Sequence, residues 1–166
     1  FWCTAVLRKG QYSGEETAKA GADTAELAIQ RDHAGKRILL AEDEPTNREI
    51  AQMLLEDVGL KVDLAEDGRE AVAKAGTASY AAILMDMQMP VLDGLDATRQ
   101  IRQLPEREAT PILAMTANAF AENKDQCFAA GMDDFIAKPV IPEVLYECLL
   151  KWLEKTGQLR TGNQPR

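Results

Sequence analysis

Four short apolar runs are spread along the chain, and each of them ends on a polar residue. The runs are Ile38–Ala41, Ala81–Met85, Pro111–Met115 and Phe135–Ala137. Runs of this length, followed by turn residues, predict strands that are buried on both faces of a sheet. The polar residues that follow or end them are Glu42 and Asp43, Asp86, Thr116 and Lys138. Parallel strands all end at one edge of their sheet, where open α/β sheets bind ligands, so we expect these side chains to converge.

Segments with helical spacing of apolar residues alternate with the predicted strands. The predicted strands are Arg37–Glu42, Lys61–Ala65, Ala81–Asp86, Ile112–Thr116 and Asp134–Ala137. The predicted helices are Thr46–Val58, Gly68–Gly76, Gly94–Leu104, Glu122–Ala130 and Pro142–Glu154. Five strands that alternate with five helices predict an α/β fold with a doubly wound parallel sheet and right-handed crossovers. Lys61–Ala65 is the most polar strand, so we expect it at an edge.

The two ends of the chain differ in composition from the segment between them. Phe1–Leu7 has the residues of a β-strand, whereas residues 10–36 have the glycine and serine content of a linker, with room for a short helix over Ala18–Ile29. We expect the folded domain to span residues 37–155 and the polar tail at 156–166 to be disordered. His33 falls in the predicted linker, where we expect a solvated side chain rather than a phosphodonor.

Charge and cysteine content exclude several classes of protein. The net charge is −8; residues 1–36 are balanced, and residues 37–166 carry 14 basic and 22 acidic side chains. This balance argues against non-specific binding of nucleic acid and fits a bound cation or a basic partner. We find no signal peptide and no apolar stretch of membrane-spanning length, so we expect a cytoplasmic segment without membrane contact. The three cysteines lack a CxxC spacing and are interpreted as reduced thiols.

The convergent side chains predict phosphoryl chemistry. Glu42, Asp43 and Asp86 would repel one another unless a cation lies among them, and an oxygen-only ligand set favours Mg²⁺. Lys138 adds a positive charge, and Thr116 adds a hydroxyl that can donate to a phosphoryl oxygen. Asp86 is then placed as a nucleophile toward phosphorus, which would give an aspartyl phosphate.

Four motifs resemble the receiver domain of two-component phosphorelays. They are Ile38–Glu44, Met85–Gly94, Met115–Ala119 and Phe135–Pro139. Their order and spacing agree with that family over residues 37–155. The resemblance implies a flavodoxin-like sheet with strand order 2-1-3-4-5.

The same resemblance implies roles for the site residues. It implies that Asp86 is the phosphoacceptor and that Lys138 contacts the phosphoryl group, with a cis peptide bond between Lys138 and Pro139. It implies that Thr116 and Phe135 form a switch that acts on the face made by the last two helices and the strand between them. The implied Mg²⁺ ligands are Glu42, Asp43, Asp86 and the backbone carbonyl of Gln88.

Within the receivers, Asp43–Asn47 and Met87–Gly94 look most like those attached to hybrid sensor histidine kinases. Phe1–Leu7 resembles the last strand of a histidine-kinase ATP-binding domain. The expected partner is therefore a histidine-kinase dimerisation domain or a histidine phosphotransfer protein, and a parent protein anchored in the inner membrane fits this interpretation. Homodimerisation stays open. The chain contains no phosphodonor histidine motif and no Gly-rich ATP lid, so we expect that it cannot phosphorylate itself from ATP. We expect the receiver to act as a phosphoacceptor with at most slow autodephosphorylation.

Two alternatives remain beside this interpretation. A phosphohydrolase of the haloacid-dehalogenase type would also use an Asp nucleophile with Mg²⁺, Thr and Lys. Enzymes of that type resemble one another in having a second Asp, which acts as acid and base, two residues after the nucleophile. In this chain that position is Gln88. A degenerate receiver that acts only through protein contacts is the second alternative, and the complete set of site residues argues against it.

Overall fold

The computed structural model describes residues 24–117 and 121–161, and for 121–123 and 157–161 it describes the backbone alone. Its centre is a five-stranded sheet with the strand order β2-β1-β3-β4-β5, in which every pairing is parallel. The strands are β1 (Arg37–Ala41), β2 (Lys61–Ala65), β3 (Ala82–Asp86), β4 (Ile112–Thr116) and β5 (Asp134–Ala137). The predicted fold class and strand order are confirmed.

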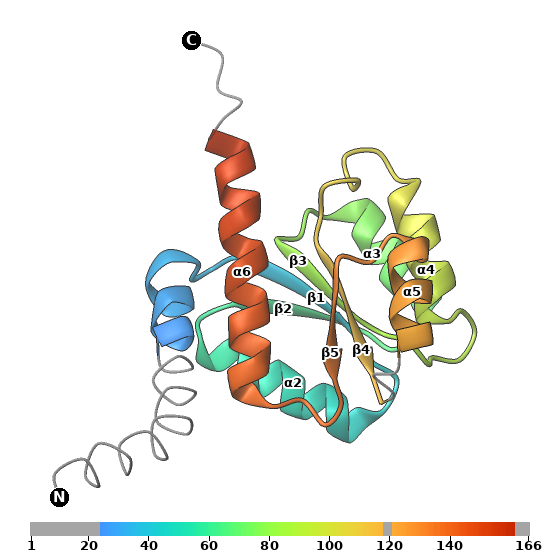
Figure 1. Ribbon diagram of the computed structural model, residues 1–166, viewed down its shortest axis with the longest axis horizontal. Helices are drawn as coiled ribbons and strands as arrows, with labels where there is room; N and C mark the ends of the chain where they lie inside the picture. Colours follow the sequence, from blue (N-terminus) through green and yellow to red (C-terminus); the bar gives the residue numbers. More distant parts are fainter. Residues whose placement is uncertain (1–23, 118–120, 162–166) are drawn as a thin grey trace, which may run out of the picture.

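Helices cover both faces of this sheet (Figure 1). They are α2 (Pro45–Asp57), α3 (Gly68–Thr77), α4 (Gly94–Arg102), α5 (Ala121–Ala130) and α6 (Pro142–Thr161). α2 and α6 lie on one face, and α3, α4 and α5 lie on the other. Most helix and strand ends agree with the prediction within one or two residues. β2 lies at an edge as predicted, and it is less buried than β1, β3 and β4.

The central strands are buried because their apolar side chains alternate between two cores. On β3, Ala82 and Leu84 belong to the core under α2 and α6, whereas Ile83 and Met85 belong to the core under α3, α4 and α5. Every residue of β3 and β4 is buried. A strand that packs on both faces needs a continuous apolar run, which is what the sequence has at these positions. The rigid sheet fixes the polar residues at its carboxyl edge.

A helix over residues 24–32 precedes β1 and packs against the domain, which corrects the predicted linker character of this part of 10–36. Ala25 and Ile29 are buried in the core under α2 and α6. His33 is only 7% exposed, so the prediction of a solvated histidine was wrong. The short helix allowed over Ala18–Ile29 overlaps this helix, but its packing on the domain through Ala25 and Ile29 was not predicted.

The end of α6 also differs from the prediction. Its backbone stays helical beyond the predicted end at Glu154, as far as Thr161, so the predicted disordered tail begins too early. A glycine inside a helix costs about 1 kcal/mol and does not end it by itself, and Lys155, Gln158 and Leu159 close to Gly157 are good helix formers. The predicted strand at Phe1–Leu7 lies outside the described residues. No helix in the described part of the chain combines the length and hydrophobicity needed to cross a bilayer.

Candidate functional site

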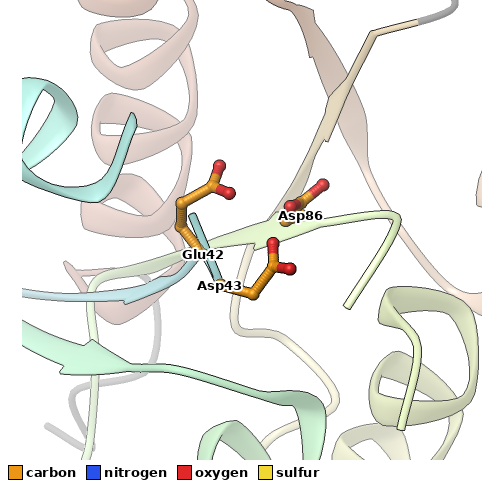
Figure 2. Close-up of side chains that lie close together, drawn as sticks. All are labelled: Glu42, Asp43 and Asp86. Atoms are coloured by element: carbon orange, nitrogen blue, oxygen red, sulfur yellow. The ribbon is translucent and has the colours of Figure 1, made fainter. Parts of the chain in front are cut away.

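Three carboxylates meet at the carboxyl edge of the sheet, as predicted (Figure 2). Glu42 and Asp43 directly follow β1, and Asp86 is the last residue of the neighbouring strand β3. One oxygen of each carboxylate lies within 4.8 Å of the others. Glu42 is 1% exposed and Asp86 is 4% exposed, so two of these acidic groups are removed from water.

The turn between β1 and α2 holds the first two carboxylates in place. The Glu44 carboxylate accepts a hydrogen bond of 2.7 Å from the Asn47 N–H and thereby caps α2. The Glu42 carboxylate accepts a bond of 3.2 Å from the Glu44 N–H. Arg48, one turn into α2, donates to the Glu42 carbonyl at 3.0 Å and forms an ion pair with Glu66 at 3.2 Å. These bonds fix the direction in which the acidic pair points.

Lys138, which follows β5, connects two of the carboxylates. Its Nζ lies 2.7 Å from Glu42 Oε2 and 3.0 Å from Asp86 Oδ2. The peptide bond between Lys138 and Pro139 is cis, as the resemblance implied. The Lys138 backbone N–H also donates to the Thr116 carbonyl at 2.8 Å, which ties the ends of β4 and β5 together.

The single positive charge of Lys138 does not balance three carboxylates, and the pKa values of the site reflect this imbalance. Burial raises the pKa of Glu42 to about 7; the Lys138 hydrogen bond opposes this shift, and the hydrogen bond and charge of Asp86 add to it. Burial works against the Lys138 charge, but the contacts with Glu42 and Asp86 outweigh it and raise the pKa of Lys138. The site is therefore short of positive charge.

The loop after Asp86 is held close to that residue. The Gln88 N–H donates to Asp86 Oδ1 at 3.1 Å. Gly94 begins α4 directly against the same loop: a Cβ atom at this position would lie 2.2 Å from the Asp86 carbonyl oxygen and 3.0 Å from the Met87 Cα. The close approach requires glycine at position 94. An open pocket of about 650 Å³ extends from the carboxylates, and Gln88, Leu95 and Thr116 contribute to its lining.

The residues that line this pocket come from four strand ends and three helices. They are Glu42, Asp43, Glu44, Asn47, Asp86, Met87, Gln88, Leu95, Thr116, Ala117, Gln126 and Lys138. The pocket therefore contains every residue predicted for the phosphoryl and metal chemistry. Phe135 is the one predicted residue that does not line it.

Thr116 and Phe135, the predicted switch pair, lie on neighbouring strands. Thr116 ends β4 inside the pocket and is 6% exposed. Phe135 on β5 is half-buried against the core under α3, α4 and α5, and the Lys124 Nζ lies 4.2 Å from the centre of its ring. An ammonium at this distance is attracted to the ring face. The aromatic ring thus contacts α5 rather than the carboxylates.

The donor set fits the predicted Mg²⁺. Glu42, Asp43 and Asp86 offer carboxylate oxygens alone, and Mg²⁺ prefers oxygen ligands and keeps several of its waters. The open pocket leaves room for those waters. A divalent cation would also supply the positive charge that Lys138 alone does not provide.

Sequence reasoning missed several supporting residues. Arg48 holds the Glu42 backbone, and Cys127 on α5 places its Sγ 3.3 Å from the Met87 Sδ in the loop after Asp86. Gln126 and Leu95 reach the pocket from α5 and α4. A helical wheel of α2 points to Arg48 as a residue facing the strand ends, but the other contacts depend on how the helices pack across the sheet.

Comparison with known proteins decides the family. Residues 38–150 match the family described as "Response regulator receiver domain". The chain belongs to the response regulator receiver family. This confirms the resemblance that the four motifs predicted.

Two similar proteins connect this receiver to sensor histidine kinases. The signal transduction histidine-protein kinase BarA of Escherichia coli is 39% identical over 120 residues, which cover 72% of this chain and 13% of BarA. The solved receiver domain of the sensor histidine kinase PA1611 from Pseudomonas aeruginosa is 43% identical, with a TM-score of 0.69. The match covers 73% of this chain and 99% of that domain, whose structure holds a magnesium ion in its active site cleft.

A third similar structure is a complex. It contains the yeast histidine phosphotransfer protein Ypd1 and the receiver domain of its downstream response regulator Ssk1. The match has 28% identity and a TM-score of 0.65, and it covers 72% of this chain and 89% of the other. The receiver described here therefore spans a small part of the sensor kinases it matches and nearly the whole of the isolated receivers.

Proposed function

We propose that this receiver accepts a phosphoryl group from a phosphohistidine onto Asp86, with Mg²⁺ bound by Glu42, Asp43, Asp86 and the Gln88 carbonyl. The observation that carries the proposal is the meeting of Asp86 with two further carboxylates and Lys138 in one pocket at the sheet edge. Family membership and the magnesium-bound relative support the same assignment. We further propose that the parent protein is a hybrid sensor histidine kinase.

The chain's own residues suit a transfer that needs positioning and neutralisation of charge. A lone pair of an Asp86 carboxylate oxygen forms the new O–P bond while the N–P bond of the phosphohistidine breaks, and its electron pair stays on the imidazole. Lys138 Nζ, already 3.0 Å from Asp86 Oδ2, is placed to pair with the phosphoryl oxygens. Bound Mg²⁺ would neutralise charge on the transferred group and on the carboxylates.

The partner proposed for this reaction is a helical protein that carries the phosphohistidine. Exposed apolar side chains lie on α2 and around the start of α6: Ile50 and Met53 on α2, Ile141 just before α6 and Val144 in its first turn. Ile50 also lines a small pocket that it shares with Lys138 and Val140. A phosphodonor helix that brings a histidine to Asp86 would have to pack beside the pocket, and the similar Ypd1–Ssk1 structure is a complex of a phosphotransfer protein with a receiver. We therefore propose this patch as the contact surface.

We propose that Thr116 and Phe135 carry the signal away from Asp86. Phosphate adds acceptor oxygens beside the buried Thr116 hydroxyl, and a shift of Thr116 changes the space next to β5. The Phe135 ring then moves against Lys124, which changes the face made by α5, β5 and α6. A ligand moves such an equilibrium only through contacts that differ between the two states, and the Thr116 hydrogen bond supplies that difference.

Phosphorylation with a small phosphodonor tests the assignment of Asp86. We expect wild type to gain the mass of one phosphoryl group after incubation with acetyl phosphate and Mg²⁺, and Asp86→Asn to gain none. Asp96→Asn is the matched control, because Asp96 is exposed and pairs with Arg99 on α4. Equal labelling of wild type and Asp86→Asn would refute the proposal.

The switch is tested separately from the phosphorylation. Thr116→Ala is expected to retain most of the labelling but to lose the NMR shifts around Phe135 and α5 that beryllofluoride produces in wild type. Thr77→Ala, at the end of α3, provides a control with the same chemical change. Identical remote shifts in Thr116→Ala and wild type would show that the coupling does not pass through this hydroxyl.

A further inference from the structure

The helix over residues 24–32 has no part in the phosphoryl site, yet it is built into the domain. Ala25 is 3% exposed and Ile29 is fully buried, both in the core under α2 and α6. Leu27 lies on the opposite side of the same helix and is 62% exposed. One face of the helix is therefore covered by the receiver, and the other faces solvent.

This helix runs beside α6 in the same direction (Figure 1). Near its start, Glu26 acts on Tyr146 of α6: burial first and then the Glu26 charge raise the pKa of Tyr146 to about 12. Just past its end, the charge of Glu154 on α6 acts to raise the pKa of His33. These electrostatic interactions are seven residues apart on one segment and eight apart on α6, and Ala25 and Ile29 share a core with Tyr146 and Leu153, so the helix packs along about two turns of α6.

The end of the helix is fastened to the end of α2. The Gln30 side chain donates to the Asp57 carbonyl at 3.3 Å, and the Gly35 N–H donates to the Gly59 carbonyl at 2.7 Å. The turn after this helix and the turn after α2 are also in close contact, because a Cβ atom at Gly59 would lie 3.3 Å from the Ala34 Cβ. The turn after the helix is thus a specific contact rather than a loose connection.

His33 lies in this turn. Its Nδ1 is buried and is the one buried side-chain nitrogen or oxygen without a hydrogen-bond partner in the described part of the chain. Burial lowers the pKa of His33, and the Lys36 charge lowers it further, while Asp32 and Glu154 act in the opposite direction with smaller effect. A protonated imidazole has two N–H donors, and a buried charge without an acceptor is costly.

We propose that residues 24–36 form a pH-sensitive docking element. The helix over residues 24–32 stays packed against α2 and α6 while His33 is neutral, and it is released when His33 takes up a proton. Release changes the direction in which the preceding chain joins the receiver. The device goes beyond the phosphoryl chemistry and does not depend on Asp86. Its residues lie at the opposite end of α2 from the carboxylates.

The direction of the pH dependence follows from the geometry. The docked histidine resists protonation more than a free histidine, whose ordinary pKa is 6.5. The docked form is therefore stabilised above that pH, and this stabilisation is lost as the pH falls through the lower pKa of the docked state.

The full chain provides a direct test, because it contains a single histidine. We expect the NMR titration of His33 to give a pKa below 6.5. We also expect hydrogen exchange of the amides in 25–33, after correction for intrinsic rates, to be about threefold or more faster at pH 5.5 than at pH 7.5. His33→Gln keeps a polar side chain but cannot titrate, so its corrected exchange should not change over this range.

Two further variants calibrate the measurement. Ile29→Asp places a charge in the buried contact and should give fast exchange at both pH values, whereas Leu27→Asp changes an exposed position and should behave as wild type. A His33 pKa at or above 6.5 would overturn the proposal, as would equal pH dependence in wild type and His33→Gln. If Ile29→Asp unfolds the whole domain, the comparison of wild type with His33→Gln still decides the question.

Discussion

At the amino end of the sheet, Arg102 makes five hydrogen bonds, whereas at the carboxyl end Lys138 alone pairs with two buried carboxylates. The partners of Arg102 are the carbonyls of Gly131, Arg107, Glu108 and Thr110 and the carboxylate of Asp133. Asp133 accepts a further bond from the Ile112 N–H at 2.9 Å. The charges at the amino end are satisfied within the fold.

The carboxyl end is left incomplete by comparison. Glu42 and Asp86 share Lys138, Asp43 adds a third carboxylate beside them, and burial leaves Glu42 with a raised pKa. Charged side chains are thus fully paired at the amino end of the sheet, whereas the carboxyl end has fewer positive than negative groups. The contrast fits our proposal that the carboxyl end binds a cation and a phosphoryl group.

The largest expected effect is at the amino end. Arg102→Ala should lower the free energy of unfolding by about 3 kcal/mol, because it leaves Asp133 and several carbonyls without their partner. Arg99→Ala is the matched control: Arg99 is exposed and pairs with Asp96 on the same helix, so it should change stability by less than about 0.5 kcal/mol. Urea denaturation measures both. Equal losses would remove the distinction between structural and surface arginines.

The two ends should also respond to pH with opposite sign. In the absence of divalent cations, folded Glu42 keeps its proton up to about pH 7, whereas the unfolded chain loses it near 4.5. Stability should therefore fall as the pH rises between these values, by on the order of 2 kcal/mol. Glu42→Gln should abolish this decrease, and urea denaturation in EDTA at pH 5, 6, 7 and 8 measures it.

Asp134, at the start of β5, provides the opposite case. Burial opposes its charge, but hydrogen bonds from Trp152, the Phe135 N–H and Lys151 outweigh burial and lower the pKa of Asp134. Its contribution to stability is present above the ordinary pKa of 3.8 and is lost as the pH falls through the lower folded value. Asp134→Asn should therefore remove part of the acid-side slope and leave the neutral slope unchanged. A neutral slope that survives Glu42→Gln would contradict the assignment to Glu42.

The smallest expected effect concerns Asp43. Asp43→Asn removes one of three clustered carboxylates, so at pH 8, where Glu42 has lost its proton, it should raise the stability of the metal-free protein by about 1 kcal/mol. The same variant should lose most of the stabilisation that Mg²⁺ gives to wild type. Thermal unfolding with and without Mg²⁺ tests both statements. A destabilised Asp43→Asn in EDTA would mean that the acidic cluster is not under repulsion.

The sequence predicted the sheet and the site well because both depend on local patterns. The bounds of β2, β4 and β5 are confirmed, since each begins and ends where an apolar run meets a turn. The convergence of Asp86 and Lys138 follows from strand order alone, and the family's spacing adds to it. The pairing of Lys138 with Glu42 was not predicted, because it depends on side-chain reach that no pattern encodes.

The contacts at the amino end of the sheet and around the helix over residues 24–32 were harder to predict from the sequence. Arg102 binds mainly backbone carbonyls, which every residue carries, so its partners leave no signal in the sequence. The burial of His33 depends on two apolar residues within a segment whose glycines and serines indicate a linker. In both places the decisive interaction joins segments that are distant in sequence and unremarkable in composition.

The close approach of Gly94 to Asp86 has a consequence for genetic variation in this receiver. Position 94 contributes no chemical group, yet any side chain there would press on the backbone of Asp86, the proposed phosphoacceptor. Alleles with alanine or serine at this position are therefore expected among loss-of-signalling variants, although no catalytic atom changes. A screen that scores only charged or polar residues as important would overlook it.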